Sequence, residues 1–456
     1  MVRNLIKTTS TALMSGVVCA SLIAPANADF FDRIFSSNKA VPSMAVSKNS
    51  TDSLLGSSSA RSHQKNIRLA SESVTNNLTW EDSFDQPAEA SYVASDTSSD
   101  PMLSANSVSK LNQAMSRYKD IVDNGGWPEI PEGRNMQIGS RDERVTILRQ
   151  RLMSEGDLKA TSQYLFHFDS AVEQAVRNFQ VRYGLPANGI VDEITLEKLN
   201  IPAYVRYGAI QSNISRLHKQ LKGLKGRYVV VNIPAAQIEA VENGRVFSRH
   251  RAVVGKIDRP TPVLNSKISQ INFNPYWHVP KSIARRDLIP LIRKDMSYLT
   301  RNDIRIYDSW GGVEIDPETI DWETITENDI VFRQDPGNNN AMASVKINFS
   351  NKHAVFLHDT PSKSLFGKYI RTFSSGCVRV ERVHDLVDWL IAGQEGIDRG
   401  QINQITFNVE RKDVDLKRPV PLKMIYMTAW AKDDGKVHFR DDIYQLDQAD
   451  LAAVNQ

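Results

Sequence analysis

The spacing of the hydrophobic residues in this chain changes at Gly226. Before that point, apolar side chains recur every three or four positions, as Val145, Leu148 and Leu152 do, which is typical of a helix with one buried face. After it, apolar and polar residues alternate, as in strands with one buried face. One kind of element does not satisfy both periods, so the chain must join a helical part to a mainly β part. Its 456 residues also exceed one ordinary core, and two or three domains are expected.

The mainly β part is predicted to span residues 226–456. The stretch QIEAVENGRVFSRHRAVVG predicts a hairpin around Asn243-Gly244, a dipeptide suited to a two-residue turn. Residues 279–344 lose the alternation and are predicted to be an insertion that acts as a lid, with a helix at 284–294. The other expected elements are strands at 267–277, 345–349 and 354–358, a helix after Cys377, and two strands around Asp434-Gly435 within 421–444.

The helical part is predicted to contain a small domain of three helices at residues 141–200. Apolar residues follow helical spacing there, and turns rich in Gly, Asn and Asp separate the helices. Two further helices, at 104–123 and 203–224, flank this unit. We expect the segments that carry them, 101–140 and 201–225, to pair as a helical scaffold.

The first 28 residues have the pattern of a cleaved secretory signal. Arg3 and Lys7 precede an apolar stretch that is short for a membrane span, and Ala26-Asn27-Ala28 forms the expected cleavage site. An uncleaved membrane anchor is the alternative, and no other segment is apolar enough to span a bilayer. Residues 29–100 are rich in Ser, Ala and Asn without a sustained hydrophobic period, so we predict a disordered linker there.

The charge and the cysteine content limit the classes of function. A formal net charge of +3 without a long run of one sign argues against a nucleic-acid-binding protein. Removal of the signal lowers this charge to +1 and takes away Cys19, which leaves Cys377 as the one cysteine. A secreted protein that uses cysteine structurally carries cysteines in pairs. A lone cysteine is by default a small buried apolar residue, but the neighbours of Cys377 favour a reactive thiol.

Cys377 has the surroundings expected of a nucleophile. His358 ends a predicted strand, nineteen residues upstream, where a side chain projects into a cleft. Gly376 permits a tight turn and exposes its N–H group. Arg379 and a helix predicted to begin near Val380 both favour the thiolate over the thiol. A histidine base, positive charge and backbone donors are the conditions for covalent catalysis by cysteine.

Other roles for these residues fit less well. A zinc site needs three or four ligands, and Cys377 with His358 lacks an H-x-E or C-x-x-C partner, so no metal is expected. His384 is assigned to a face of the following helix and not to the base, and His353 to the opposite face of the strand from His358. Asp359 either orients His358 or is a surface turn residue.

Two stretches of the sequence resemble known families. Phe168-Asp169, Ala175-Val176, Phe179-Gln180, Gly184-Leu185, Gly189, Val191, Thr195 and Leu199 match the peptidoglycan-binding module of many wall enzymes. From Gly226 onward the chain resembles the L,D-transpeptidases, the cysteine enzymes that cross-link peptidoglycan. The stretches that carry this resemblance are VVGKIDRPTPVLNSKISQINFNPYWHVP, RQDPGNNNAMASVKINFSNKHAVFLHDT and SSGCVRV. Ser375 and Arg379, in place of the more common histidine and asparagine, are similar to the large periplasmic branch of Gram-negative bacteria.

The resemblance implies a multidomain fold: a mainly β L,D-transpeptidase catalytic domain with an inserted lid, a three-helix peptidoglycan-binding domain and a helical scaffold. It implies a periplasmic enzyme that releases D-Ala from a tetrapeptide stem and joins two stems by a 3→3 meso-diaminopimelate cross-link. The nucleophile is then Cys377, the base His358, and a carbapenem acylates the cysteine. No cofactor is implied, because the thiol, the imidazole and backbone amides complete the chemistry. Ser375 and Gly376 are expected either to stabilise the oxyanion or to support the turn. The residues expected to bind substrate are Arg379, Trp277, Phe356 and Ser374.

The partners and the acceptor stay partly open. Donor and acceptor peptidoglycan stems are the expected partners, together with other wall-synthesis proteins, and neither nucleic acid nor a stable membrane span after signal removal is expected. If water accepts the acyl group from the thioester, the enzyme is an L,D-carboxypeptidase. If a lysine of an outer-membrane lipoprotein accepts it, the enzyme anchors that lipoprotein to peptidoglycan. A non-catalytic wall-binding scaffold is the alternative from another class.

Overall fold

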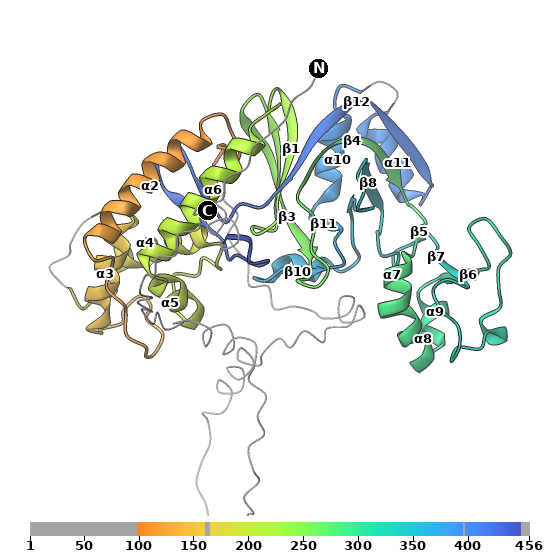
Figure 1. Ribbon diagram of the computed structural model, residues 1–456, viewed down its shortest axis with the longest axis horizontal. Helices are drawn as coiled ribbons and strands as arrows, with labels where there is room; N and C mark the ends of the chain where they lie inside the picture. The colour runs from red at the N-terminus through yellow and green to blue at the C-terminus, as the bar shows by residue number, and fades with distance from the viewer. Residues whose placement is uncertain (1–97, 160–164, 395–396, 448–456) are drawn as a thin grey trace, which may run out of the picture. The chain divides into compact units, whose positions relative to one another are not determined.

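A computed structural model describes residues 98–159, 165–394 and 397–447 of the chain (Figure 1). The expected signal peptide and almost all of the expected linker lie outside these residues, as does Cys19. The first strand, β1 (Arg227–Asn232), begins directly after Gly226, where the hydrophobic spacing changes. Helices precede this point and strands dominate after it, which confirms the predicted fold class.

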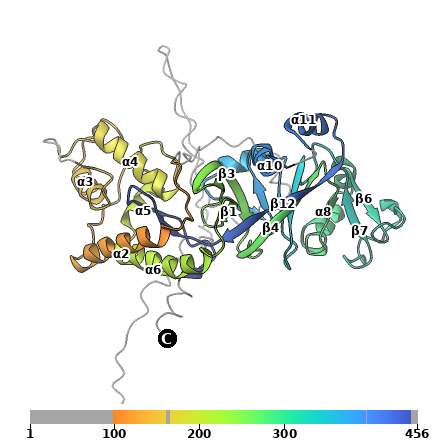
Figure 2. The same ribbon diagram turned by 90° about the horizontal axis from the view of Figure 1, so that it is seen from above.

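In residues 98–159 and 165–225, the helical part shows two long helices and three shorter ones between them in sequence. The long helices, α2 (Ser107–Asp123) and α6 (Ala203–Gln220), lie side by side in both views (Figures 1 and 2). Between them lie α3 (Arg144–Ser154), α4 (Ser170–Tyr183) and α5 (Glu193–Asn200), the three helices predicted there.

Caps explain why these helices begin and end where they do. The side chains of Asp169 and Asp192 accept hydrogen bonds from the free N–H groups at the starts of α4 and α5. Gly184, with φ of 69°, ends α4 in the left-handed conformation that glycine adopts without strain.

The β part is built on one large sheet. Within the described residues its nine strands follow the order β10-β3-β11-β9-β8-β4-β12-β1-β2. The predicted hairpin is formed by β2 and β3, with φ of 51° at Asn243 and 78° at Gly244. The strand bounds are β2 Gln237–Glu242, β3 Arg245–Gly255, β4 Leu264–Phe273, β8 Val345–Phe349, β9 Leu357–His358, β10 Thr372–Ser374, β11 Val378–Val380 and β12 Lys412–Ile425.

One face of this sheet packs against helix α10 (Val383–Ile391). Ile271, Ile347, Leu357 and Val378 are fully buried and occupy one cross-strand row from β4 to β11. They share a hydrophobic cluster with six residues of α10. Helix α11 (Arg399–Phe407) adds Ile402 and Ile405 to the same cluster. Since side chains alternate along each strand, the neighbouring residues of the row point to the opposite face.

The insertion folds around a small core of its own. Its strands β5 (Trp277–His278), β6 (Ile304–Tyr307) and β7 (Val331–Gln334) form a separate sheet, so this subdomain begins two residues before the predicted 279. Trp277, Leu288, Ile306 and Phe332 are among its buried residues. The helical pieces are α7 (Lys281–Ile283), the π-helix η2 (Ala284–Leu288), α8 (Ile289–Lys294), α9 (Ser297–Arg301) and the short 3₁₀ helix η3 (Pro317–Thr319). A further 3₁₀ helix, η4 (Lys363–Gly367), follows β9.

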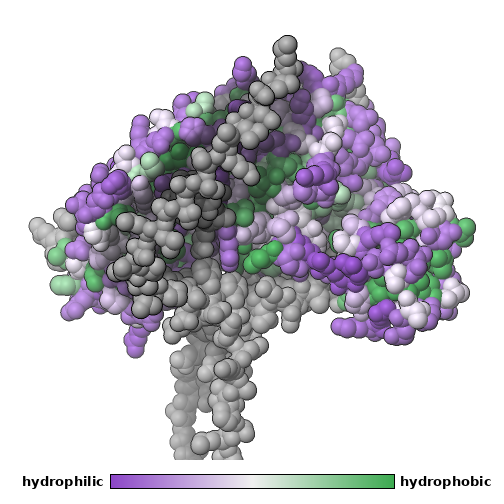
Figure 3. Space-filling view, viewed as in Figure 1, coloured by the Kyte–Doolittle hydropathy of each residue, from purple (hydrophilic) through white to green (hydrophobic). Residues whose placement is uncertain are grey.

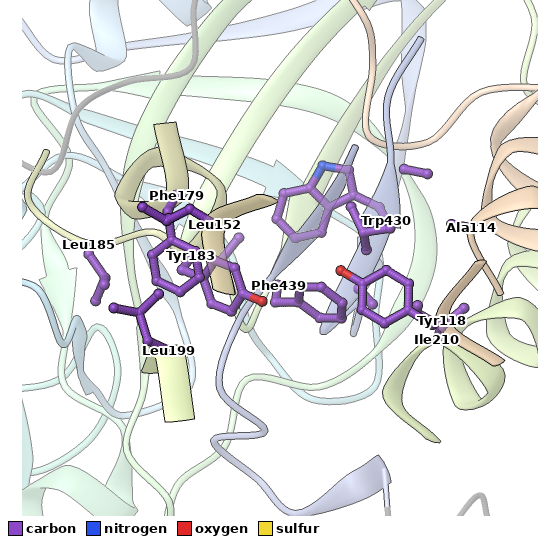
Figure 4. Packing of buried hydrophobic residues seen from close by; sticks show 14 of the residues in the cluster. Ala114, Tyr118, Leu152, Phe179, Tyr183, Leu185, Leu199, Ile210, Trp430 and Phe439 are labelled. Carbon is purple, nitrogen blue, oxygen red and sulfur yellow. The ribbon is translucent and has the colours of Figure 1, made fainter. Parts of the chain in front are cut away.

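The C-terminal hairpin of β13 (Ala429–Ala431) and β14 (Val437–Phe439) packs against the helical part. Phe439 lies between Tyr118 of α2 and Tyr183 of α4, with ring centroids 5.7 and 5.4 Å away (Figure 4). Asn213 of α6 exchanges two hydrogen bonds with Thr428 just before β13. The last strands of the chain are therefore anchored in the core of its first described helices.

Three predicted boundaries are wrong for identifiable reasons. The strand expected at 354–358 contains only Leu357 and His358, because Asn351 accepts hydrogen bonds from the N–H groups of His353 and Val355 and holds a turn there. The strand expected at 267–277 ends at Phe273, because Asn274 has a left-handed φ of 44° that interrupts the extended backbone. The helix expected near Val380 starts at Val383, because residues 378–380 pair with β9 and β3 as a strand.

No helix in the described part of the chain combines the length and the apolar character that a bilayer crossing needs. The surface is largely hydrophilic in the view of Figure 3, with hydrophobic residues scattered among polar ones over the insertion. Trp310 and Val313 of the insertion are 54% and 72% exposed.

Candidate active site

The candidate site occupies the sheet face opposite α10. His358 is the register partner of Arg379 on β11 and of Lys346 on β8. Paired residues on adjacent strands point to the same face, so Lys346, His358 and Arg379 form one row of three side chains. Asn272 of β4 continues the row beyond Lys346, and its side chain donates a hydrogen bond to Asp413 of β12 at 2.7 Å.

Cys377 lies in a tight turn that leads into β11. The φ of 108° at Gly376 is accessible to glycine and strained for other residues. The Ser374 hydroxyl bridges the turn: it accepts the N–H of Gly376 at 3.2 Å and donates to the carbonyl of Cys377. Cys377 itself is partly exposed and packs at the edge of the main cluster, beside Phe356.

The loop between β3 and β4 is hydrogen-bonded to this turn. Thr261, buried, donates from its hydroxyl to the carbonyl of Gly376 at 2.9 Å and accepts the N–H of Gly255 at 2.8 Å. A Cβ at Gly255 would lie 2.2 Å from the carbonyl oxygen of Arg259, so only glycine allows the loop to fold back this closely.

His358 is oriented by the main chain. Its Nδ1 lies 2.6 Å from the carbonyl oxygen of Asp359, and a carbonyl only accepts, so the proton is on Nδ1 and Nε2 keeps its lone pair. The carboxylate of Asp359 is used elsewhere, by Ser344 at 2.8 Å and by Lys363. His384 bonds Ser344 at 2.9 Å, and His353 is exposed. Asp359 thus orients His358 through its backbone, not through its side chain.

The resting charge states differ from the expectation. Burial raises the pKa of the Cys377 thiol to about 11, and the opposing effects of the Phe356 backbone, Lys346 and Arg379 are smaller. Burial, with Arg379 and Lys346, lowers the pKa of His358 to about 3, against the influence of Asp359. Arg379 lowers the pKa of the thiol, as expected, but the loss of water outweighs this effect and keeps the thiol neutral in the resting site.

Arg379 and the backbone provide polar groups that face the thiol. The Nε and Nη1 atoms of Arg379 are buried and have no hydrogen-bond partner among the described residues. Burial lowers its pKa to about 10, and Cys377 acts in the opposite direction. The Gly376 N–H, expected as an oxyanion donor, is already donated to Ser374. In the described residues no acceptor is found for the N–H groups of Cys377 and Ser375, which leaves these two as available donors.

The two aromatic residues of the predicted site belong largely to packing. Trp277 is 6% exposed and lies in the core of the insertion. Phe356 is half-buried, packs against that same core, and has its ring centroid 5.5 Å from that of His358. Phe356 is thus at the site, whereas Trp277 supports the subdomain beside it.

Sequence reasoning missed three residues around the site. Lys346 alternates with the buried Val345 and Ile347, so the strand pattern carried a signal that it faces the site. Thr261 and Arg259 lie in a loop without a periodic pattern and gave no such signal.

Arg259 joins the nucleophile turn to the insertion. Its guanidinium donates to the hydroxyl of Ser375 at 3.0 Å and to both carboxylate oxygens of Asp287 on η2, one of them at 3.1 Å. Both partners of this ion pair are 18% exposed.

In the described part of the chain, no group of three His, Cys, Asp or Glu side chains is arranged to hold a metal ion.

Comparisons with known proteins match two parts of the chain to described families. Residues 226–402 match the L,D-transpeptidase catalytic domain, and residues 141–199 match the family described as "Putative peptidoglycan binding domain". A Haemophilus influenzae protein described as "Putative L,D-transpeptidase" is 33% identical over 229 residues. That match covers 50% of this chain and 46% of the relative, so the chain spans about half the length of this curated relative.

Solved L,D-transpeptidases are similar at a low level. The Stackebrandtia nassauensis structure is 16% identical, with 65% of this chain and 96% of that chain covered and a TM-score of 0.24. The Xylanimonas cellulosilytica structure is also 16% identical, with 65% and 99% covered and a TM-score of 0.21. The family matches, not these scores, therefore support the assignment. Residues 226–402 are an L,D-transpeptidase catalytic domain, joined in one chain to a domain of the peptidoglycan-binding family at residues 141–199.

Proposed function

We propose that this protein is a periplasmic L,D-transpeptidase that forms 3→3 meso-diaminopimelate cross-links in peptidoglycan. The observation that carries the proposal is the position of Cys377 in the turn that leads into β11, beside His358 on the neighbouring strand β9, with Nδ1 of His358 bonded to the Asp359 carbonyl and Nε2 left free. A neutral imidazole of this kind accepts a proton from a thiol as the sulfur attacks a carbonyl.

The first half of the reaction transfers the donor stem to the enzyme. The sulfur of Cys377 attacks the carbonyl carbon at the L-centre of diaminopimelate while its proton moves to His358. The N–H groups of Cys377 and Ser375 are the donors available to the resulting oxyanion. When the tetrahedral intermediate collapses, His358 returns the proton to the leaving amine, D-Ala departs, and a thioester remains.

The second half transfers the donor to a second stem. The side-chain amine of its diaminopimelate attacks the thioester, loses a proton to His358, and the thiol of Cys377 is regenerated. Arg379, with two buried N–H groups that lack a partner, is proposed to bind a carboxylate of the substrate. Residues 279–344 are proposed to act as a lid that excludes water, and residues 141–200 to hold the enzyme on peptidoglycan.

Mass spectrometry of the intact mature protein with a carbapenem tests the nucleophile. We expect one drug-sized adduct on the wild type and none on Cys377→Ala. Absence of an adduct on folded wild-type protein would contradict the proposal and favour a wall-binding scaffold.

Incubation with tetrapeptide stems tests the base and the acceptor. His358→Gln should lower kcat by about 100-fold or more, whereas His384→Gln, a matched change at a histidine that bonds Ser344, should lower it less than about tenfold. Stem dimers joined by 3→3 links support transpeptidation. Release of D-Ala without dimers would identify a carboxypeptidase instead.

A further inference from the structure

The candidate site contains two cations on opposite sides of His358. Lys346 on β8 and Arg379 on β11 are both register partners of His358, on the strands that flank β9. Neighbouring strands lie about 5 Å apart, so both side chains are within reach of a ligand that lies over the imidazole. The mechanism proposed above uses Arg379 and leaves Lys346 without a role.

Neither cation has an anionic partner in the described part of the chain. Lys346 lies over Phe356, with Nζ 4.5 Å from the ring centroid, and forms no ion pair there. Nε and Nη1 of Arg379 are buried and unbonded. The nearest carboxylates are engaged: Asp359 with Ser344 and Lys363, and Asp413 with Asn272 and Arg411.

The two cations without an anionic partner indicate a binding site for an anionic ligand. Unbonded N–H groups of a buried guanidinium are costly unless a ligand occupies them, and a planar carboxylate fits such a group in a bidentate manner. Arg379 follows Cys377 by two residues, and both cations pair in register with His358, so a ligand held by them lies over the imidazole next to the nucleophile turn.

We propose that Lys346 is a specificity-determining residue that binds, together with Arg379, a carboxylate of the donor stem next to the carbonyl that Cys377 attacks. This inference deepens the proposed function and depends on it. Two carboxylates of a tetrapeptide stem have the required chemistry: the terminal carboxylate of the leaving D-Ala and the side-chain carboxylate of diaminopimelate.

Binding of the carboxylate also prepares His358 for its role. The charged groups that face the imidazole are Arg379, Lys346 and Asp359, and the two cations oppose its protonation. A carboxylate between these cations cancels their charge. The imidazole of the occupied site then accepts the thiol proton more readily than that of the empty site.

Kinetics with amidated donors test the proposal. Three stems are compared: one with free carboxylates, one ending in D-alaninamide, and one with the diaminopimelate side-chain carboxylate amidated. For the free stem, Lys346→Met should raise KM about tenfold with a smaller change in kcat, and Lys346→Arg should restore KM to within about threefold. The amidated stem for which wild type and Lys346→Met have equal KM identifies the bound carboxylate. An equal rise for all three stems, or no rise, would overturn the proposal.

Alkylation of Cys377 provides a test that needs no turnover. Iodoacetate is anionic and iodoacetamide is neutral, so the ratio of their rates reports the positive charge beside the thiol. We expect Lys346→Met to lower this ratio at least about threefold and Lys352→Met, the same change at an exposed lysine of the next turn, to leave it unchanged. An unchanged ratio of the two alkylation rates in Lys346→Met would contradict the proposal that Lys346 lies beside the thiol. Normal turnover by Cys377→Ala would contradict the proposed function instead.

Discussion

At the scale of single residues, burial determines the protonation states of Cys377 and His358. Both side chains titrate far from the range in which a thiolate–imidazolium pair would form, because each loses more by desolvation than it gains from its charged neighbours. A neutral thiol of this kind is less prone to oxidation than a thiolate.

The pH dependence of alkylation tests this resting state. A thiol whose pKa is raised to about 11 reacts through its small thiolate fraction, which grows as the pH rises. The rate with iodoacetamide should therefore increase about tenfold per pH unit between pH 7 and 10, without a plateau. Cys377→Ala gives the background rate, and a plateau below pH 8 would show an activated thiolate instead.

At the scale of elements, the turn before β11 fixes the nucleophile. Gly376→Ala places a Cβ at a position with φ of 108°, where the nearest atom is 3.6 Å away, so the strain is in the backbone and not in packing. We expect a loss of about 1–2 kcal/mol in the free energy of unfolding, together with a much slower acylation by a carbapenem.

Gly244→Ala in the β2–β3 turn is the matched control. Its φ of 78° is also left-handed and no atom lies within 4 Å of a Cβ there. It should lose similar stability in urea denaturation and keep the acylation rate of the wild type. Slow acylation in both variants would mean that general destabilisation, not the turn at Cys377, is responsible.

The ion pair between Arg259 and Asp287 joins the same turn to the π-helix of the insertion. It is largely shielded from solvent and Arg259 also holds Ser375, so its loss should free both elements. We expect Asp287→Asn to speed hydrogen exchange at residues 284–288 and to lower the rate of carbapenem acylation about threefold or more. Glu314→Gln, which removes an exposed ion pair with Arg305 in the same insertion, should change neither quantity.

At the scale of the whole molecule, a buried network of charges connects helices α2, α3 and α4 to strand β14. Glu155 accepts hydrogen bonds from Arg151, Arg182, Tyr118 and Tyr183, which come from three helices. Arg182 also bonds Asp157 and donates to the carbonyl of Val437 in β14. The peptidoglycan-binding domain and the hairpin that follows the catalytic domain therefore share one network.

Arg182→Met tests the contribution of this network. The variant removes one cation from two buried carboxylates, of which Glu155 keeps Arg151 and Asp157 keeps Lys436, so we expect the free energy of unfolding to fall by about 2–3 kcal/mol in urea denaturation. Arg177→Met, one helical turn earlier, removes a half-exposed pair with Glu173 and should cost less than about 1 kcal/mol. Equal effects of the two changes would argue against a coupling of the domains through this network.

The sequence by itself determined the elements and the identity of the key residues. The change of hydrophobic period at Gly226, the Asn243-Gly244 turn and the three helices of residues 141–200 depend on side chains a few positions apart, and such local signals are readable in one dimension. The Ser-Ser-Gly-Cys turn and the histidine upstream were readable for the same reason.

Only the tertiary structure decided how these residues meet and which charges they carry. The row of Lys346, His358 and Arg379 depends on the register of three strands, and the strand containing His358 proved shorter than its pattern indicated because Asn351 holds a turn before it. The neutral thiol depends on burial by residues distant in sequence, and desolvation is a property of the folded surroundings that no local pattern contains.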